Sequence, residues 1–331
     1  MTDWTGRRVL VTGAGGFIGS HLATELVERG ARVTAMLHYH ARPARGNLEF
    51  FPSEAVDQME VVRGDVRDSH FMLRAVEDVE VVFHLAALIA IPYSYVAPGA
   101  YVTTNVIGTL NVLEACRANR TPRLVHTSTS ECYGTARYTP INEEHPLQGQ
   151  SPYSATKIGA DKLVESYCRS FDLPAATLRP FNAFGPGQSA RAVIPTILSQ
   201  LIAGRPELRL GSLEPIRDMS YVANAVDAFL QIADCDEAIG ETVNAGSGEG
   251  RTIQEIAEAA MEVVGRRVPV VLDPQRVRPD ESEVLELICD NGKAERLMGW
   301  RPTVGFTEGL KLTASFVEAH PEIYRPEEYA L

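Results

Sequence analysis

A tyrosine and a lysine stand four residues apart in the segment SPYSATK, as Tyr153 and Lys157. In a helix, residues at this spacing share one face, so we expect the phenol and the ammonium to lie side by side. A neighbouring ammonium favours the phenolate and lowers the pKa of a tyrosine. A phenol tuned in this way can take the proton of an alcohol or sugar hydroxyl, which is one half of an alcohol oxidation.

Polar side chains also end a hydrophobic run upstream. The stretch LVHTSTSECYG, residues 124–134, is typical of a buried strand that finishes in Thr129, Ser130 and Glu131. Two interpretations of Glu131 are open: a catalytic carboxylate, or a strand-end carboxylate paired with a surface cation. We favour the first, because titratable groups in such clefts are commonly tuned for catalysis. Cys132 is expected to pack in the interior, since no base is evident beside it.

A glycine-rich loop supplies the other half of an oxidation. The stretch VLVTGAGGFIGSHL places Gly13, Gly16 and Gly19 where a first strand meets a first helix. Glycines there let the backbone approach a pyrophosphate, whose charge lies at the helix N-terminus. The alternative is an ordinary glycine turn. In this strand-to-helix context we expect a dinucleotide site, with a nicotinamide as hydride acceptor.

The end of the second predicted strand does not choose between NAD+ and NADP+. An NAD-specific fold usually has an acid there for the ribose hydroxyls. This chain has Leu37 and His38 instead, with Arg42 and Arg45 close enough in sequence to attract a 2′-phosphate. Asp65, in RGDVRD after the third strand, has two open interpretations: an adenine contact or a strand-end cap.

These residues need a framework, and the first half of the chain predicts one. Short apolar runs at 8–12, 32–36, 59–62, 79–85 and 123–128 alternate with helical patterns, the first with Ile18, Leu22 and Leu26 on one face. Apolar strands separated by helices predict a parallel sheet covered on both faces, an α/β, Rossmann-type doubly wound fold.

After about residue 180, Gly/Pro-rich turns separate helical patterns near 193–203, 221–233, 252–264 and 305–318. We therefore expect residues 1–180 to form mainly a dinucleotide-binding domain. Residues 181–331 are expected to form mainly a smaller C-terminal substrate-binding region, with some strands returning to the main sheet.

The composition narrows the partners and the compartment. The chain has 331 residues, 45% hydrophobic and 22% charged, with a net charge of −12. This suits a globular protein, and the absence of a basic footprint argues against nucleic acid as a partner. The five cysteines are scattered without a CxxC pair, which favours a reducing cytoplasm and argues against a disulfide framework or a metal site.

Neither a leader nor a membrane span is expected. The N-terminal MTDWTGRRVLVTG enters a strand pattern almost at once, which leaves no room for a signal peptide. From Val81, the run VVFHLAALIAIPYSYVAPGAYV has no Asp, Glu, Lys or Arg. It contains His84, Pro92 and Gly99, which suit a buried strand and loop better than a bilayer span.

Ordered motifs along nearly the whole chain resemble the nucleotide-sugar epimerase/dehydratase family of extended short-chain dehydrogenases. The motifs are TGAGGFIG, GDVRD, FHLAA, NVIGTLNVLEA, STSECYG, PYSATK, RPFNAFGPGQ and RDMSYVANAV. The segments LIAIPYSY and PLQGQSPYSATKIGADKL look most like 4,6-dehydratases of the UDP-N-acetylglucosamine type. The family also implies a homodimer formed through helices at 98–118 and 152–171.

The resemblance implies two sets of binding residues. It places the cofactor, with a lean to NAD+, against Gly13, Gly16, Phe17, Ile18, Gly19, His38, Asp65, Val66, Leu85, Ala86, Ala87, Tyr153 and Lys157. It places a nucleotide-diphosphate sugar against Tyr93, Ser94, Asn182, Arg217 and Arg278, the two arginines clamping the diphosphate. Pro92 stands where related uronate epimerases have an arginine, which argues against a charged sugar.

The resemblance also implies the reaction. Thr129 and Tyr153 would contact the sugar 4-hydroxyl, and Glu131 would remove the C5 proton once C4 is a ketone, as a 4,6-dehydratase requires. Ser130 departs from the Asp of many dTDP-glucose 4,6-dehydratases, so Glu131 or a water must protonate the leaving hydroxyl. The alternatives are a C4-epimerase, a UDP-glucuronate decarboxylase or a non-catalytic dinucleotide-binding protein.

Overall fold

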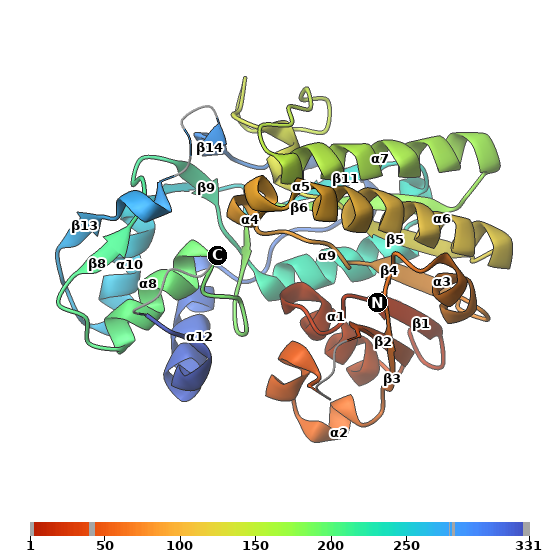
Figure 1. The fold of residues 1–331 in the computed structure, drawn as a ribbon, viewed down its shortest axis with the longest axis horizontal. Coiled ribbons are helices and arrows are strands. Elements are labelled where there is room, and N and C mark those ends of the chain that lie inside the picture. The colour runs from red at the N-terminus through yellow and green to blue at the C-terminus, as the bar shows by residue number, and fades with distance from the viewer. Residues whose placement is uncertain (1–2, 40–43, 278, 280–281, 327–331) are drawn as a thin grey trace.

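The computed structural model describes residues 3–39, 44–277, 279 and 282–326. Figure 1 shows a larger part that holds the main sheet and a smaller part that holds the helices α8, α10 and α12. Segments that follow residue 180, among them the strand β11, also lie in the larger part.

The main sheet has seven strands, all parallel, in the order β11-β6-β5-β4-β1-β2-β3. The strands are β1 (Arg8–Thr12), β2 (Arg32–His38), β3 (Glu60–Gly64), β4 (Val81–His84), β5 (Arg123–Thr127), β6 (Ala175–Pro180) and β11 (Thr242–Ala245). The predicted Rossmann-type doubly wound sheet is confirmed. The edge strand β11 comes from the C-terminal half of the chain.

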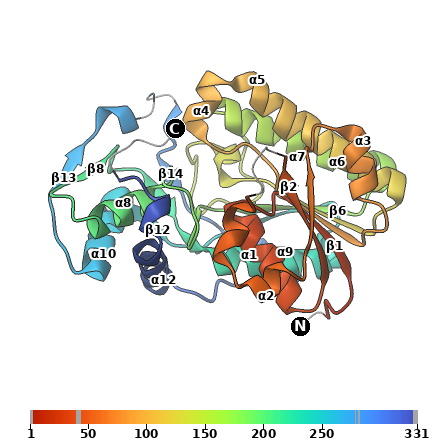
Figure 2. The same cartoon turned by 60° about the horizontal axis from the view of Figure 1, so that its bottom comes forward.

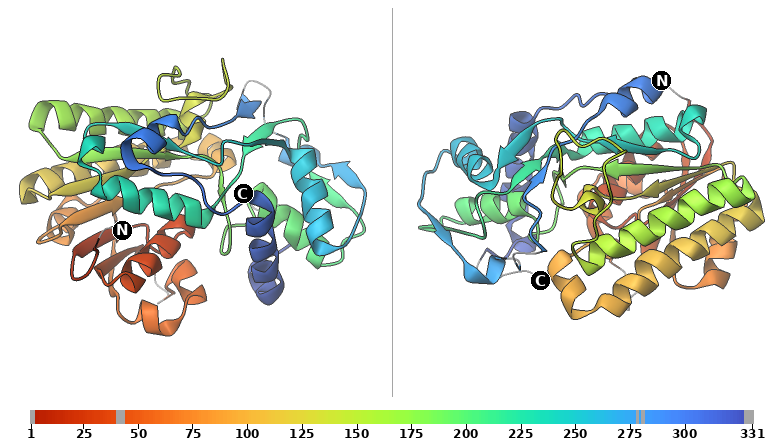
Figure 3. Two further views of the ribbon diagram at one scale, coloured as in Figure 1. Left: turned by 180° about the vertical axis from the view of Figure 1, so that it is seen from behind. Right: turned by 90° about the horizontal axis from the view of Figure 1, so that it is seen from above.

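Helices cover both faces of the sheet, as Figures 2 and 3 show. Because side chains alternate along a strand, Val9 and Val11 of β1 pack on one side and Leu10 on the other. The first side is covered by α1 (Phe17–Glu28) and α9 (Val222–Asp234), and the second by α3 (Ser69–Ala75), α6 (Gly108–Asn119) and α7 (Pro152–Phe171). This explains why the strands are almost continuously apolar in sequence.

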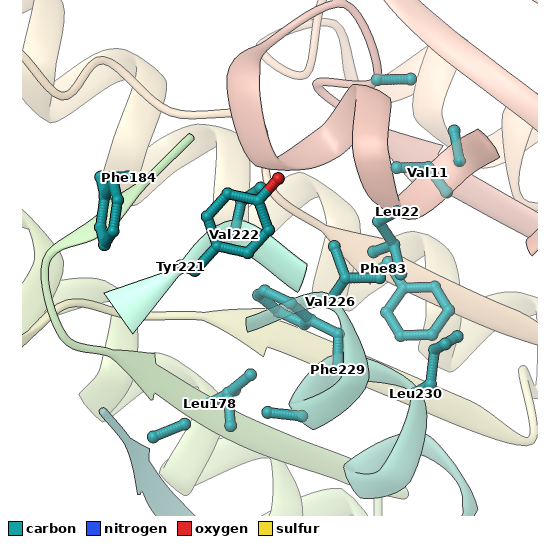
Figure 4. Packing of buried hydrophobic residues seen from close by; sticks show 14 of the residues in the cluster. Val11, Leu22, Phe83, Leu178, Phe184, Tyr221, Val222, Val226, Phe229 and Leu230 are labelled. Carbon is teal, nitrogen blue, oxygen red and sulfur yellow. The ribbon is translucent and has the colours of Figure 1, made fainter. Parts of the chain in front are cut away.

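The core on the α1 side joins the two halves of the chain. Figure 4 shows Leu22 of α1 and Phe83 of β4 packed near Val226 and Phe229 of α9. The rings of Phe83 and Phe229 meet edge to face with centroids 6.4 Å apart. Since α9 follows residue 180, the N-terminal and C-terminal halves of the chain share one core.

The smaller part is built from short strands and the helices α8, α10 and α12. Its pairs are β8 (Leu208–Leu210) with β13 (Val270–Leu272), β7 (Ala183–Phe184) with β10 (Ser220–Tyr221), and β9 (Ile216–Asp218) between β12 (Gly250–Thr252) and β14 (Glu286–Leu287). Its helices are α8 (Val193–Ile202), α10 (Ile253–Val264) and α12 (Phe306–Ala319), whereas α11 (Gly292–Met298) packs on the edge strand β11 of the main sheet. The helices predicted near 193–203, 252–264 and 305–318 are confirmed within two residues.

The remaining helices are α2 (Ser53–Val56), α4 (Ile91–Val96) and α5 (Pro98–Tyr101). The uncharged run from Val81 forms β4, α4 and α5, and no described helix has the length and apolar character to cross a membrane. The helix expected at 98–118 is present with an irregularity, because a π-helical stretch, Val102–Ile107, joins α5 to α6.

Candidate active site

The start of α7 is fixed by its own residues. Ser151 caps the helix and exchanges hydrogen bonds with Ser154, at 3.1 Å and 3.0 Å, and Pro152 occupies the first turn. This capping box determines where the helix begins, and so places Tyr153 in the first turn and Lys157 one turn later. Both side chains are buried, with exposed fractions of 7% and 4%.

Burial changes the expected ionisation of this pair. The Lys157 Nζ donates to the carbonyl oxygen of Thr127, at the end of β5, over 2.5 Å. Burial raises the pKa of Tyr153 well above its usual range, although a hydrogen bond from Thr129 lowers it. Burial likewise lowers the pKa of Lys157. The sequence-based expectation of a lowered tyrosine pKa is therefore wrong for this state, because desolvation disfavours both charged forms.

The polar residues that follow β5 lie next to the phenol of Tyr153. Thr129 precedes a 3-10 helix, Ser130–Tyr133, and its hydroxyl accepts the backbone N–H of Glu131 at 3.3 Å. Ser130 and Glu131 are buried, with exposed fractions of 1% and 8%, and the charge of Glu131 raises the pKa of Tyr153. Within the described ranges no cation pairs with Glu131, so the interpretation as a salt-bridged surface carboxylate finds no support there. The structure thus gathers Thr129, Glu131, Tyr153 and Lys157.

A row of tyrosines leads from the phenol toward solvent. The rings of Tyr153 and Tyr101 have centroids 6.3 Å apart, and those of Tyr101 and Tyr93 lie 6.2 Å apart. Tyr93, on α4, is 42% exposed. Its predicted companion Ser94 is fully buried, and its hydroxyl donates to the carbonyl of Ile91 at 2.6 Å. Of the two predicted sugar contacts on α4, Tyr93 is therefore the accessible one.

The glycine loop fits a dinucleotide. Gly13 has a left-handed φ of +73°, and a Cβ there would lie 2.9 Å from the amide nitrogen of Ala86. A Cβ on Gly19 would lie 2.3 Å from the carbonyl oxygen of Gly13. The N-cap Gly16 offers no side-chain cap to α1, whose first residues are Phe17 and Ile18. Close backbone packing and an uncapped helix N-terminus are what a pyrophosphate site requires.

The ends of β1 and β4 form the floor beside this loop. The amides of Leu85 and Ala86 both donate to the Thr12 hydroxyl at 3.1 Å, which fixes the Leu85–Ala86–Ala87 segment against β1. Val66, after β3, is buried, and its carbonyl oxygen accepts a hydrogen bond from the side-chain amide of Asn111 on α6 at 2.9 Å. The predicted cofactor residues from β1, β3 and β4 thus lie along the carboxyl ends of their strands.

At the adenosine end, an acid lies beside β2 although β2 itself carries none. The Asp65 carboxylate lies 3.7 Å from Nδ1 of His38. Side-chain hydrogen bonds from Arg67 hold the pKa of Asp65 below its usual value. Arg45 pairs with Asp57 at 3.1 Å, and Arg42 lies outside the described residues. Arg45 is thus already engaged by a carboxylate.

The three predicted nucleotide-sugar residues beyond β6 have different environments. The side-chain oxygen of Asn182 is buried and has no hydrogen-bond partner within the described part of the chain, so it offers a free acceptor. Arg217 on β9 is buried, pairs with Glu283 at 3.0 Å and donates to the Ile216 carbonyl at 3.1 Å. Arg278 lies outside the described residues.

Sequence reasoning missed Asp161 and Arg179, which lie next to this centre. Asp161 stands four residues after Lys157 on α7, and pairs with Arg179 of β6 at 2.7 Å. The repeated spacing of four residues was the available signal. As for metals, no group of three or more potential ligands from His, Cys, Asp and Glu occurs among the residues described.

Comparison with known proteins shows the family to which this chain is related. The family model for GDP-mannose 4,6 dehydratase matches residues 10–313. The chain is 33% identical to UDP-glucose 4-epimerase of Mycolicibacterium smegmatis over 314 residues, which cover 93% of this chain and 98% of the relative. It is 30% identical to dTDP-glucose 4,6-dehydratase of Xanthomonas campestris pv. campestris over 339 residues, which cover 96% and 93% of the two chains.

A solved structure of a nucleotide-sugar dehydratase also matches the chain over nearly its whole length. The dTDP-glucose 4,6-dehydratase DesIV from Streptomyces venezuelae, solved with NAD bound, matches with a TM-score of 0.87 at 28% identity. The match covers 96% of this chain and 99% of that one. Relatives that perform two different reactions are therefore about equally similar to this chain.

Proposed function

The chain belongs to the nucleotide-sugar epimerase and dehydratase family of extended short-chain dehydrogenases, and from that premise we propose that it is a nucleotide-sugar 4,6-dehydratase. The observation that carries the proposal is Glu131. The residue is 8% exposed, and its carboxylate acts electrostatically on the Tyr153 phenol and pairs with no cation in the described part of the chain. Such a group is free to take part in proton transfer.

The first step requires a base for the 4-hydroxyl. Tyr153 takes this proton, and Thr129, which hydrogen-bonds the phenol, orients it. A nicotinamide cofactor, when bound at the glycine loop, supplies the hydride acceptor. Because burial raises the pKa of Tyr153, the fraction of phenolate and the rate of this step should rise with pH through the neutral range.

The second step distinguishes a dehydratase from an epimerase. A ketone at C4 acidifies the C5 proton, which Glu131 removes. The same carboxyl group then protonates the hydroxyl that leaves C6 as water, because Ser130 is too weak an acid for this task. Return of the hydride to C6 and of a proton to C5 gives a 4-keto-6-deoxy sugar nucleotide, one water lighter than the substrate.

A C4-epimerase is the second candidate. It is favoured by the serine at position 130 and by the 33% identity to a UDP-glucose 4-epimerase. An epimerase needs no base for C5, and would leave the buried Glu131 without a chemical task. The uronate decarboxylase is favoured less, because Pro92 offers no cation for a sugar carboxylate.

The deciding experiment weighs the products formed from a panel of nucleotide sugars. Loss of one water supports the dehydratase, and loss of carbon dioxide supports the decarboxylase. An unchanged mass with a new sugar supports the epimerase. If no sugar in the panel reacts while the bound dinucleotide is intact, the proposal of catalysis is overturned.

For the cofactor we propose NAD+, retained through purification because the hydride returns within each turnover. The NAD-bound relative, the Asp65 carboxylate beside His38 and the pairing of Arg45 with Asp57 support this choice. Denaturing the protein and analysing the supernatant tests it. Release of NADP+, or of no nicotinamide nucleotide at all, would contradict it.

We also propose that the nucleotide sugar is bound by Tyr93, Asn182, Arg217 and Arg278.

We further propose that the enzyme is a cytoplasmic homodimer formed through α6 and α7. Those two helices lie side by side on one face (Figure 3), and Val102, Ile107 and Phe171 on the helical segments are each more than 40% exposed. The five cysteines are free thiols, as is usual in a reducing compartment. Sedimentation of the purified protein tests the dimer.

A further inference from the structure

A third ionisable residue continues the face of α7 that carries the proton-transfer pair. Tyr153, Lys157 and Asp161 follow one another at intervals of four residues and therefore lie in a row along the helix. Asp161 is as deeply buried as the other two, with an exposed fraction of 5%. A buried carboxylate is costly unless it is paired and hydrogen-bonded, so its partners indicate what it is for.

Groups at the ends of β5 and β6 hold both oxygens of this carboxylate. The Ser128 hydroxyl donates to Oδ2 at 2.6 Å, and Nη2 and Nε of Arg179 donate to the same oxygen at 2.7 and 3.2 Å. Nε2 of His126 lies 3.2 Å from Oδ1. The carboxylate is thus fixed in place, one helical turn from Lys157.

The charges in this cluster do not balance. Burial raises the pKa of Asp161, but the bond to His126 and the charges of Arg179 and Lys157 outweigh it and hold the pKa well below its usual range. His126 stays neutral, because burial lowers its pKa. One carboxylate therefore faces two cations, and Asp161 is the main influence that opposes the lowering of the Lys157 pKa by burial.

Other titratable groups face the cluster from every element around it. They are His84 on β4, His126 on β5, Glu131, Cys132 and Tyr133 in the 3-10 helix, Tyr153 on α7 and Arg179 on β6. Burial lowers the pKa of His84 and raises those of Cys132 and Tyr133, so these three stay neutral near pH 7. With these three neutral, Asp161 is the main charge that offsets the effect of burial on Lys157.

We propose that Asp161 is a positioning residue for the proton-transfer pair: its fixed carboxylate keeps the buried Lys157 in its ammonium form, seated on the Thr127 carbonyl next to Tyr153. Arg179, which pairs with the carboxylate of Asp161, neutralises part of its charge. The inference rests on the proposed function for the task of Tyr153 and Lys157. The charge coupling between Asp161 and Lys157 can be measured whatever the substrate.

The direct test follows the titration of Lys157 itself. The chain has four lysines, at positions 157, 162, 293 and 311, so labelling their ε-carbons with ¹³C gives a simple NMR spectrum. Lys157→Met identifies the resonance of interest. In Asp161→Asn the titration midpoint of Lys157 should fall by about one pH unit, since a nearby opposite charge shifts a pKa by about that amount or more.

Two further variants make the test specific. Arg179→Gln should raise the Lys157 midpoint, because it removes a cation and leaves the Asp161 carboxylate less neutralised. Glu165→Gln is the matched control, because Glu165 is a partly exposed acid one turn further along α7 that pairs with Lys162 and Arg169. It should leave the midpoint unchanged. If Asp161→Asn does not fold, the upward shift in Arg179→Gln decides.

The pH dependence of turnover gives a second readout. Both limbs of the rate profile should move to lower pH in Asp161→Asn, because removing a negative charge lowers the pKa of Tyr153 as well as that of Lys157. Reduced rates with an unmoved profile and an unmoved Lys157 titration would overturn the inference and leave Asp161 a folding residue. If wild-type protein turns over no nucleotide sugar, the proposed function fails, and the NMR shifts still decide the coupling.

Discussion

The proposed catalytic centre and the proposed nucleotide-sugar side of the molecule are held in opposite ways. In the centre, Lys157 donates a hydrogen bond to the backbone of β5, and Tyr153 lies in the first turn of α7, whose start is fixed by a capping box. On the sugar side, Arg217 is held by the carboxylate of Glu283 in a connecting segment, and the oxygen of Asn182 has no described partner. If the proposed roles are right, the centre is preorganised before substrate arrives, whereas the sugar side must exchange or complete its contacts on binding.

This difference has consequences for substitutions. A group that is fixed before the reaction and acts on the reacting atoms affects the rate of chemistry. A group that binds the same part of the substrate in the ground state and the transition state affects KM alone. The four predictions below test that contrast, in order of decreasing effect.

The largest effect is expected at the phenol. Tyr153→Phe removes the base for the 4-hydroxyl, and kcat should fall by about 10²- to 10⁴-fold. Nucleotide-sugar binding, measured by calorimetry, should change little, because the ring remains. A variant within about tenfold of the wild-type rate would show that another group takes the proton. Tyr138→Phe is a suitable control, since that tyrosine is 44% exposed and hydrogen-bonds Asn142.

Glu131→Gln should divide the reaction into its steps. The amide is nearly isosteric, so oxidation at C4 remains possible while elimination falls by about 10²-fold or more. The variant should accumulate reduced nicotinamide, visible in the near ultraviolet, without a 4-keto-6-deoxy product. In deuterated water, wild type should incorporate one deuterium at C5 and the variant none. Elimination at a near wild-type rate would return Glu131 to a structural role and favour the epimerase.

The cofactor loop allows a matched pair of glycine substitutions. Gly13 and Gly265 both have a φ of +73°, but only Gly13 has backbone within 3 Å of the position of a Cβ, whereas nothing lies within 4 Å of that position at Gly265. Each alanine should lower the free energy of unfolding by about 1 to 2 kcal/mol from the left-handed backbone. Gly13→Ala should lower the free energy of unfolding further than Gly265→Ala, and the variant should no longer retain its bound nicotinamide nucleotide. Equal losses in both variants would mean that the close approach to Ala86 is unimportant.

The smallest effect is expected on the sugar side. Arg217→Lys keeps the charge and loses the forked donor, so KM should rise by about tenfold, or about 1.4 kcal/mol, with kcat unchanged. Arg209→Lys on strand β8 is the control, because that side chain is 60% exposed and pairs with Glu207. A fall in kcat rather than a rise in KM would show that the sugar side is also part of the chemistry.

The local features of this protein could be predicted from the sequence because they repeat at short range. Apolar runs alternating with helical patterns predicted the parallel sheet, and the four-residue spacing predicted that Tyr153 and Lys157 share one face of a helix. The glycine spacing predicted a tight strand-to-helix turn. In the structure, a Cβ on Gly13 or Gly19 would lie too close to backbone atoms of other residues. Each of these patterns depends on neighbours in the chain.

Other features depended on which strands became neighbours, and only the tertiary structure decided them. The sequence predicted that some later strands return to the main sheet, but not which ones; the structure shows that β11 joins the sheet and α9 the core, which brings residues beyond 220 against those before 90. The acid beside His38 comes from the end of β3, 27 positions later in the sequence. Burial raised the pKa of Tyr153 where sequence spacing predicted that Lys157 would lower it. Spacing indicates which groups are close, but their charge states depend on how much water and which distant partners the folded chain leaves around them.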